Sequence, residues 1–206
     1  MSMPSYLNME VLFLKSADEN IEKMTENNYI GGEGLEHMLD DIIESNLQYG
    51  FMIITSLNCY IENALSDILA ISLGDKNASG NILTKINKLE KHFGIKVQYN
   101  NSNIDNMRKI RNYLVHFKTA FVGEATGTLD FEIKGKFAGK YFTKSNMQSL
   151  RSESYYFVKK VAQLCNLDIW DYADVIGCTG MEIPITYIYD SSISYEDIDI
   201  VKSIDN

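Results

Sequence analysis

Apolar residues recur every three or four positions through much of this chain, and that spacing predicts α-helices. The longest stripe runs from Phe51 to Leu73 and is followed by Gly74, as is typical of a helix end. Stripes of the same period predict one short helix within residues 1–30 and further helices at 35–44, 79–93, 104–118 and 146–166. Ser79 is the expected N-cap of the third of these, with Gly94 closing it, and Ser102 or Asn103 is expected to cap the helix at 104–118.

The period changes once, after the helix at 104–118. Leu129, Phe131 and Ile133 alternate with polar residues, glycines follow, and residues 140–142 resume an apolar run. This pattern predicts a β-hairpin insertion at about 127–143. An acidic C-terminal extension, residues 167–206, follows the last helix. It could cover the hairpin edge, lie over a basic face or be free in solvent, and the sequence does not choose between these.

With 206 residues, 45% of them hydrophobic, the chain is long enough for a single domain with one core. No run reaches the ~18 apolar residues that a membrane span needs, and the N-terminus does not resemble a secretion signal, so we expect a cytoplasmic protein without a membrane partner. The three cysteines are widely spaced, which favours reduced, structural thiols.

The net charge of −9 argues against an indiscriminate nucleic-acid binder. The charges are nevertheless segregated along the chain. Residues 83–118 carry eight Lys or Arg against two acidic residues, a net +6, and residues 134–160 carry seven against one, also a net +6. These two basic segments could join in space or could be ordinary helix surface.

The basic helix at 104–118 combines an apolar stripe with candidate chemistry. The stripe consists of Met107, Ile110, Leu114, Phe117 and Phe121. The neighbouring face carries Arg108, Arg111, Asn112 and His116, so that permanent cations lie beside the one side chain that titrates near neutrality. Arg111 and His116 lie at opposite edges of this face, and two copies of the helix across a two-fold axis would bring both pairs around one cleft.

The segment Arg-Asn-Tyr-Leu-Val-His from Arg111 to His116 resembles the Arg-x4-His motif of the HEPN superfamily (higher eukaryotes and prokaryotes nucleotide-binding domain). The resemblance covers about residues 48–166, which are the expected core of the domain. It implies an all-α antiparallel bundle of four to five helices, often a homodimer through the motif helix. It also implies a metal-independent endoribonuclease without a cofactor, of the kind that acts as a toxin or phage-defence effector and is held by an antitoxin or other regulatory partner. Some relatives carry a modifiable Tyr two positions after the His, where this chain has Lys118, so regulation by that route is not expected.

In this interpretation His116 transfers the proton from the 2′-hydroxyl, and Arg111 holds the phosphate with its planar fork. Asn112, one turn before His116, would orient the imidazole or the phosphate. The candidate substrate-binding residues are Arg108, Lys109 and Lys118. Glu62 is similar to an acidic position of the family and would orient Arg111, although plain exposure is the alternative.

Two other functions stay open. A non-catalytic helical domain that binds nucleotides or proteins could use the same motif only to dimerise. A metal-dependent hydrolase could use the carboxylates of the helix at 35–44, where His37 and Asp41 lie one turn apart, as do Asp40 and Glu44. No second His or Cys completes a ligand set there, so we expect no metal site.

Overall fold

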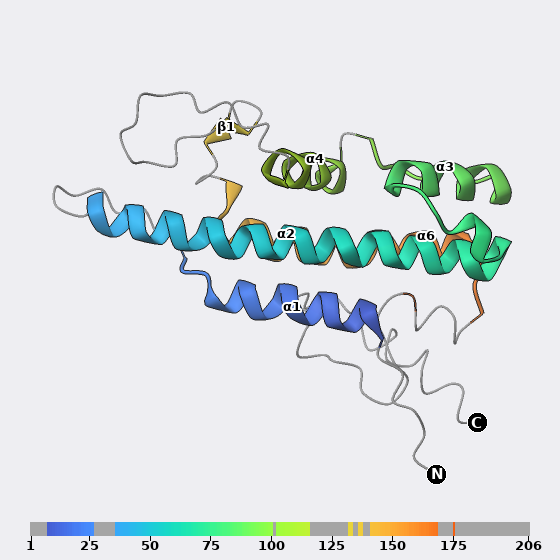
Figure 1. Cartoon of the computed structure of the whole chain (residues 1–206), viewed down its shortest axis with the longest axis horizontal. Coiled ribbons are helices and arrows are strands. Elements are labelled where there is room, and N and C mark those ends of the chain that lie inside the picture. Colours follow the sequence, from blue (N-terminus) through green and yellow to red (C-terminus); the bar gives the residue numbers. More distant parts are fainter. Residues whose placement is uncertain are drawn as a thin grey trace, which may run out of the picture. The chain divides into compact units, whose positions relative to one another are not determined.

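The computed structural model describes residues 8–26, 36–100, 102–115, 132–133, 136–137, 141–168 and 175, without the side chains of residues 36–44 and 113 or of the strands. These residues are mostly helical (Figure 1), which confirms the all-α class. The elements are α1 (Met9–Lys23), α2 (Glu36–Leu73), the 3-10 helix η1 (Asp75–Asn77), α3 (Ile82–Phe93), α4 (Asn103–Val115), β1 (Glu132–Ile133), β2 (Lys136–Phe137) and α6 (Lys144–Leu164). The HEPN-like arrangement of the bundle stays a prediction.

Contacts within the chain form two compact units. Unit 1 consists of residues 1–15, 59–98 and 152–206, and unit 2 of residues 16–58 and 99–151. Helices α1, α2 and α6 each contribute one part to either unit, whereas α3 belongs to unit 1 and α4 to unit 2. The prediction of one domain with its core at 48–166 is not tested by this division, and we describe each unit by itself.

Helix α2 is one continuous helix of 38 residues, so the prediction of two helices at 35–44 and 51–73 was wrong at their boundary. The intervening residues lack an apolar stripe and include Gly50, a residue that disfavours helices. Here Gly50 is helical and buried against Phe142. The helix ends at Gly74 as predicted, with φ at 84° and its N–H bonded to the Ala70 carbonyl at 2.8 Å.

The caps of α3 and α4 follow the expected chemistry, with one correction. The N-cap of α3 is Asn81 and not Ser79, because the Asn81 side chain accepts the Thr84 N–H at 2.9 Å. At the other end Gly94 adopts a left-handed conformation with φ at 66°, as predicted. Helix α4 begins at Asn103, and the Ser102 hydroxyl accepts the Asp105 N–H at 3.2 Å, which confirms Ser102 as a cap.

In unit 2, α1 runs antiparallel to α2. The hydroxyls of Ser16 and Ser56 lie 3.0 Å apart, and just beyond the end of α1 the Thr25 N–H donates to the side-chain oxygen of Asn46 at 3.0 Å. A buried ion pair also joins α1 to α6, since Arg151 donates to both carboxylate oxygens of Asp18 at 3.0 and 3.1 Å. Buried apolar side chains of this unit are Ala17, Ile21, Met24, Ile53, Ile54, Leu57, Ile104, Met107, Ile110, Phe142, Met147 and Leu150.

Unit 1 gathers the C-terminal half of α2, helix α3 and the C-terminal half of α6. Its buried apolar side chains include Tyr60, Ile61, Ala64, Leu65, Ile68, Leu69, Ile82, Ile86, Leu89, Tyr155, Val158, Val161, Ala162 and Cys165. The stripes predicted for the helices at 51–73 and 79–93 thus contribute to the core of this unit, together with residues of α6. Burial raises the pKa of the Cys165 thiol to about 11, so this cysteine stays protonated near neutral pH, as expected of a structural thiol.

The segment predicted to form a hairpin contains two strands of two residues each. Strands β1 and β2 pair antiparallel, with Glu132 opposite Phe137 and Ile133 opposite Lys136. The rest of residues 116–140 lies outside the described part, so the hairpin insertion at 127–143 stays a prediction. The apolar run at 140–142 is not a strand where it is described, because Tyr141 is helical and the fully buried Phe142 lies in a bend.

No helix among the described residues is long and apolar enough to cross a membrane.

Candidate functional site

Helix α4 turns an apolar stripe inward and carries the motif residues beside it. Met107 and Ile110 are buried and Leu114 is half-buried, as the stripe predicted, while Phe117 and Phe121 lie outside the described residues. The side chains of Arg108, Lys109, Arg111 and Asn112 are half-buried on the flanks of this stripe. The buried stripe therefore determines which side of α4 faces the core, and the cationic side chains lie on the flanks of that side.

The first two cations are compensated by one acid of the same helix. Asp105, itself 3% exposed, accepts a hydrogen bond from Nη2 of Arg108 at 2.9 Å and another from the ammonium of Lys109. Arg108 also donates from Nε to the hydroxyl of Tyr99 at 3.1 Å. Burial raises the pKa of Tyr99 to about 12, so the hydroxyl is neutral and accepts this bond at physiological pH.

Arg111 is arranged differently. Its Nη1 donates to the side-chain oxygen of the neighbouring Asn112 at 3.2 Å, and its Nε is buried without a hydrogen-bond partner in the described part of the chain. No carboxylate among the described residues forms an ion pair with it. No acidic side chain in the described part of the chain therefore compensates the charge of Arg111, which favours an anion as its ligand.

His116 and Lys118, the predicted proton-transfer residue and one predicted substrate-binding residue, lie outside the described residues. The structure thus brings Arg111 and Asn112 together and leaves the third motif residue as a prediction. For Arg108 and Lys109, also predicted to bind substrate, the contacts with Asp105 add a structural role that the residue spacing alone did not assign.

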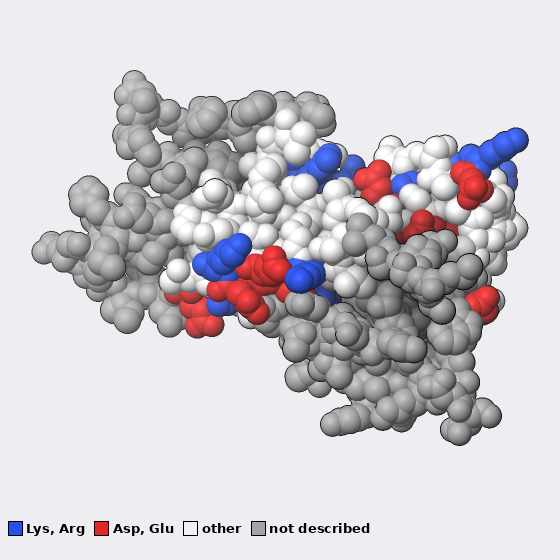
Figure 2. Space-filling model, turned by 60° about the horizontal axis from the view of Figure 1, so that its bottom comes forward, with Lys and Arg blue, Asp and Glu red and all other residues white. Residues whose placement is uncertain are grey.

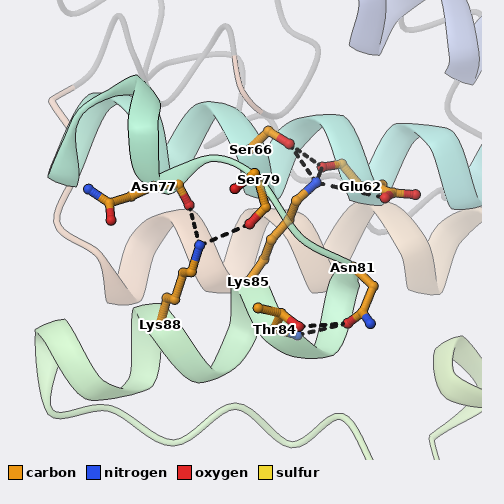
Figure 3. Close-up of polar contacts among 8 residues, drawn as sticks. All are labelled: Glu62, Ser66, Asn77, Ser79, Asn81, Thr84, Lys85 and Lys88. Atoms are coloured by element: carbon orange, nitrogen blue, oxygen red, sulfur yellow. Dashed lines mark hydrogen bonds and ion pairs between the residues drawn. The ribbon is translucent and has the colours of Figure 1, made fainter.

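Glu62, the predicted supporting residue, lies in unit 1 with a buried lysine of α3 (Figure 3). The ammonium of Lys85 donates to the Glu62 carbonyl at 2.9 Å and to the Ser66 hydroxyl at 2.6 Å, and lies 3.9 Å from the Glu62 carboxylate. Burial lowers the pKa of Lys85, and the nearby acids Glu62 and Asp67 oppose this. Because Arg111 belongs to unit 2, the pairing of Glu62 with Arg111 stays a prediction.

The Lys85 ammonium and the Ser66 hydroxyl are close enough to act as a base and a nucleophile, but the contacts around them indicate a structural role. The Ser66 hydroxyl donates to the Glu62 carbonyl at 2.8 Å, a bond back to the preceding helical turn. Ser66 also lies inside α2, where backbone N–H groups are bonded within the helix and none is available to stabilise an oxyanion. Lys85 therefore fastens α3 to α2. Its position in the apolar stripe, between Ile82 and Leu89, was the sequence signal for this role.

A second lysine of α3 fastens the connection from α2 (Figure 3). The ammonium of Lys88 donates to the backbone carbonyls of Asn77 at 2.8 Å and Ser79 at 2.9 Å. Two of the eight Lys and Arg residues in the basic segment at 83–118 are thus bonded to protein carbonyls. The net charge of this segment overstates the charge that it offers to a ligand.

A further polar contact of unit 1 was not predicted. Glu10 of α1 is 3% exposed and accepts the side-chain N–H of Asn63 on α2 at 2.6 Å. Burial raises the pKa of Glu10 to about 7, and the neighbouring carboxylate of Asp67 adds to this rise, whereas the bond from Asn63 opposes it. Burial also raises the pKa of Asp67. No sequence signal marks this pair, since Glu10 and Asp67 are far apart along the chain.

Acidic and basic side chains lie next to one another on the face drawn in Figure 2, and do not form separate patches there. On α1, for example, exposed Lys15 and Lys23 flank exposed Glu19 and Glu22. Among the residues that the structure describes, no group of three or more His, Cys, Asp or Glu side chains is placed to hold a metal ion. The side chains of residues 36–44, where a metal was considered, lie outside that set.

Comparison with protein-family models, with curated protein sequences and with solved structures gives no match for this chain.

Proposed function

We propose that this protein is a metal-independent endoribonuclease of HEPN type that acts as a homodimer through α4. The observation that carries the proposal is the contrast between Arg111 and its neighbours. Arg108 and Lys109 share the carboxylate of Asp105, whereas Arg111 has no acidic partner among the described residues and retains an unpartnered Nε. An uncompensated guanidinium at the motif position favours a phosphate ligand.

In the proposed reaction, Arg111 binds two oxygens of the scissile phosphate, and Asn112 restrains its guanidinium through the 3.2 Å bond. His116 removes the proton from the 2′-hydroxyl, and the 2′-oxygen attacks phosphorus. The bond to the 5′-oxygen breaks, and this oxygen takes a proton from His116 of the partner subunit. The products are a 2′,3′-cyclic phosphate and a free 5′-hydroxyl. A regulatory or antitoxin partner would restrain such an activity in a cell, which fits a toxin or antiviral effector.

The compensation of two cations by Asp105 favours one competing function. A helix face whose charges are neutralised internally is less costly to bury against another protein than a face of free cations. Val115, at the end of α4, is 38% exposed and adds apolar surface. A non-catalytic interaction domain that dimerises through α4 is therefore the second candidate.

Incubation of the purified protein with a mixed RNA pool in the presence of a chelator tests the proposal. Fragment ends are examined for a 2′,3′-cyclic phosphate, and light scattering measures the oligomeric state. We expect cleavage by the wild type, and a loss on the order of 10²-fold or more in His116→Ala with the dimer intact. His92→Ala, which removes an exposed histidine of α3, is the matched control and should cleave normally.

Absence of cleavage by a dimeric wild-type protein would favour the interaction domain. Cleavage that occurs only when the chelator is omitted would contradict the metal-independent mechanism.

A further inference from the structure

Unit 1 contains a cavity of about 290 Å³ that none of the preceding arguments uses. It lies between the segment that follows α3 and the C-terminal half of α6, and it is lined by Lys96, Val97, Gln98, Phe157, Lys160, Val161 and Leu164. Its volume is close to the lower limit of about 300 Å³ for small-molecule sites. Arg111 belongs to unit 2 and is not among the residues that line this cavity.

The wall formed by the segment after α3 is held by a half-buried acid. Glu90, whose side chain is only 18% exposed, accepts the backbone N–H of Val97 at 2.9 Å. Gly94 reverses the chain at the end of α3 with its left-handed conformation, and the Glu90 contact holds the following residues in place. The turn at Gly94 and the Glu90 contact therefore both hold this wall in place, so that a ligand would meet a preformed surface.

The chemistry of the lining is divided between apolar and cationic groups. Phe157, Val161 and Leu164 come from one side of α6, at positions i, i+4 and i+7, and provide an apolar floor. Lys160 of the same helix is exposed, and Lys96 on the opposite wall has a side chain that is 89% exposed. The Lys96 ammonium lies 3.5 Å from Glu90, a surface pair that water and salt weaken. Among the residues that the structure describes, no acidic side chain lines the cavity.

We propose that this cavity binds a compact organic anion, in which an apolar body contacts the α6 floor and a single carboxylate or phosphate lies between Lys96 and Lys160. The proposal goes beyond the nuclease function and does not depend on it. An aliphatic carboxylate and an aromatic phosphate share this chemistry, and octanoate and adenosine monophosphate are suitable probes for the two sources.

Calorimetric titration of the full chain with each probe tests the site. We expect one of the two probes to bind with a dissociation constant below 1 mM at low salt, roughly the affinity of a small ligand with a few good contacts. Lys160→Gln should weaken binding about three- to fivefold, as expected for one exposed ionic contact. Lys159→Gln, which removes the preceding charge of α6 outside the cavity lining, should leave the affinity unchanged.

Val97→Trp provides a second test, because it fills the cavity from a non-helical segment and leaves the charges in place. We expect it to abolish binding while circular dichroism and the denaturation midpoint remain those of a folded protein. Three results would overturn the proposal: binding of neither probe, equal weakening by Lys159→Gln and Lys160→Gln, or inorganic phosphate binding as tightly as the better probe.

Discussion

The side-chain oxygen of Asn112 accepts a hydrogen bond of 3.2 Å from Nη1 of Arg111, the residue before it on α4. This bond restrains the guanidinium and leaves its charge uncompensated, since an amide is neutral. The distinction matters because the neighbouring Arg108 is restrained by a carboxylate. Any role of Arg111 in binding RNA therefore depends on the residue at 112 being neutral.

The first prediction follows from this dependence. Asn112→Asp has almost the same shape but places a negative charge beside Arg111, so we expect RNA affinity to fall about tenfold at low salt, equivalent to about 1.4 kcal/mol. Fluorescence anisotropy with a 2′-O-methyl RNA, which cannot be cleaved through its 2′-oxygen, measures it. Asn106→Asp on the same helix controls for the added charge. Equal losses in the two variants would indicate a general electrostatic effect.

The second prediction concerns Asp105. Asp105→Asn removes the carboxylate that Arg108 and Lys109 share, so we expect a loss of about 2 kcal/mol in the free energy of unfolding, because hydrogen bonds to a charged group are lost. The same change frees two cations, so RNA affinity at low salt should rise severalfold and fall more steeply with salt. Urea denaturation and salt-dependent anisotropy measure the two effects.

Asp75→Asn, at an exposed position of η1, is the matched control for Asp105→Asn. A variant at Asp105 that lost both stability and RNA affinity would show that Asp105 holds α4 in the binding conformation, and the proposed compensation of charge would be wrong.

The elements that sequence predicted well are those whose ends are determined by local chemistry. Gly74 and Gly94 end their helices with a positive φ, a backbone conformation that glycine adopts without a steric penalty. Ser102 caps α4 through its own hydroxyl. These features involve residues within one helical turn. The period of the apolar stripe is local in the same way, and it predicted the burial of Ile82, Ile86 and Leu89 in α3 and of Met107 and Ile110 in α4.

The features that sequence did not predict depend on residues distant in the chain. Two helices were predicted on either side of residues 45–50, yet α2 continues through Gly50, and the ring of Phe142 occupies the space where a side chain at this position would lie. The charge count of residues 83–118 likewise did not reveal that Lys85 is buried against α2. Arg111 and Asn112 were chosen from the resemblance of residues 111–116 to the HEPN motif, and their function stays a prediction, whereas the role of Asp105 required the contacts.

The third prediction concerns pH. The pKa of Glu10 is about 7 in the folded protein, above its ordinary value of 4.5, so folding favours the protonated form. The stability that this group contributes is therefore complete below about pH 4.5 and is lost as the pH rises through 7. We expect Glu10→Gln, which stays neutral, to be about 2 kcal/mol more stable relative to the wild type at pH 8 than at pH 4.5.

Urea denaturation at the two pH values measures this difference, with Glu19→Gln, an exposed position of the same helix, as the control. If Glu10→Gln and the wild type keep the same stability difference at both pH values, Glu10 does not titrate between them and the prediction is wrong. Asp67 contributes to the same transition, so Asp67→Asn should also reduce the pH dependence.

The fourth prediction tests the contact that allows α2 to continue. A Cβ atom at Gly50 would lie 2.1 Å from Cδ1 of Phe142, well inside van der Waals contact. Alanine is the better helix former by about 1 kcal/mol, yet overpacking a buried ring costs about 1–3 kcal/mol, and a clash this close places the cost at the upper end. We expect Gly50→Ala to lower the free energy of unfolding by about 2 kcal/mol, whereas Gln48→Ala at an exposed site of the same helix should not.

In Gly50→Ala/Phe142→Leu the smaller side chain relieves the clash, so the double variant should be about as stable as Phe142→Leu alone. Additive losses would mean that Gly50 is required for another reason.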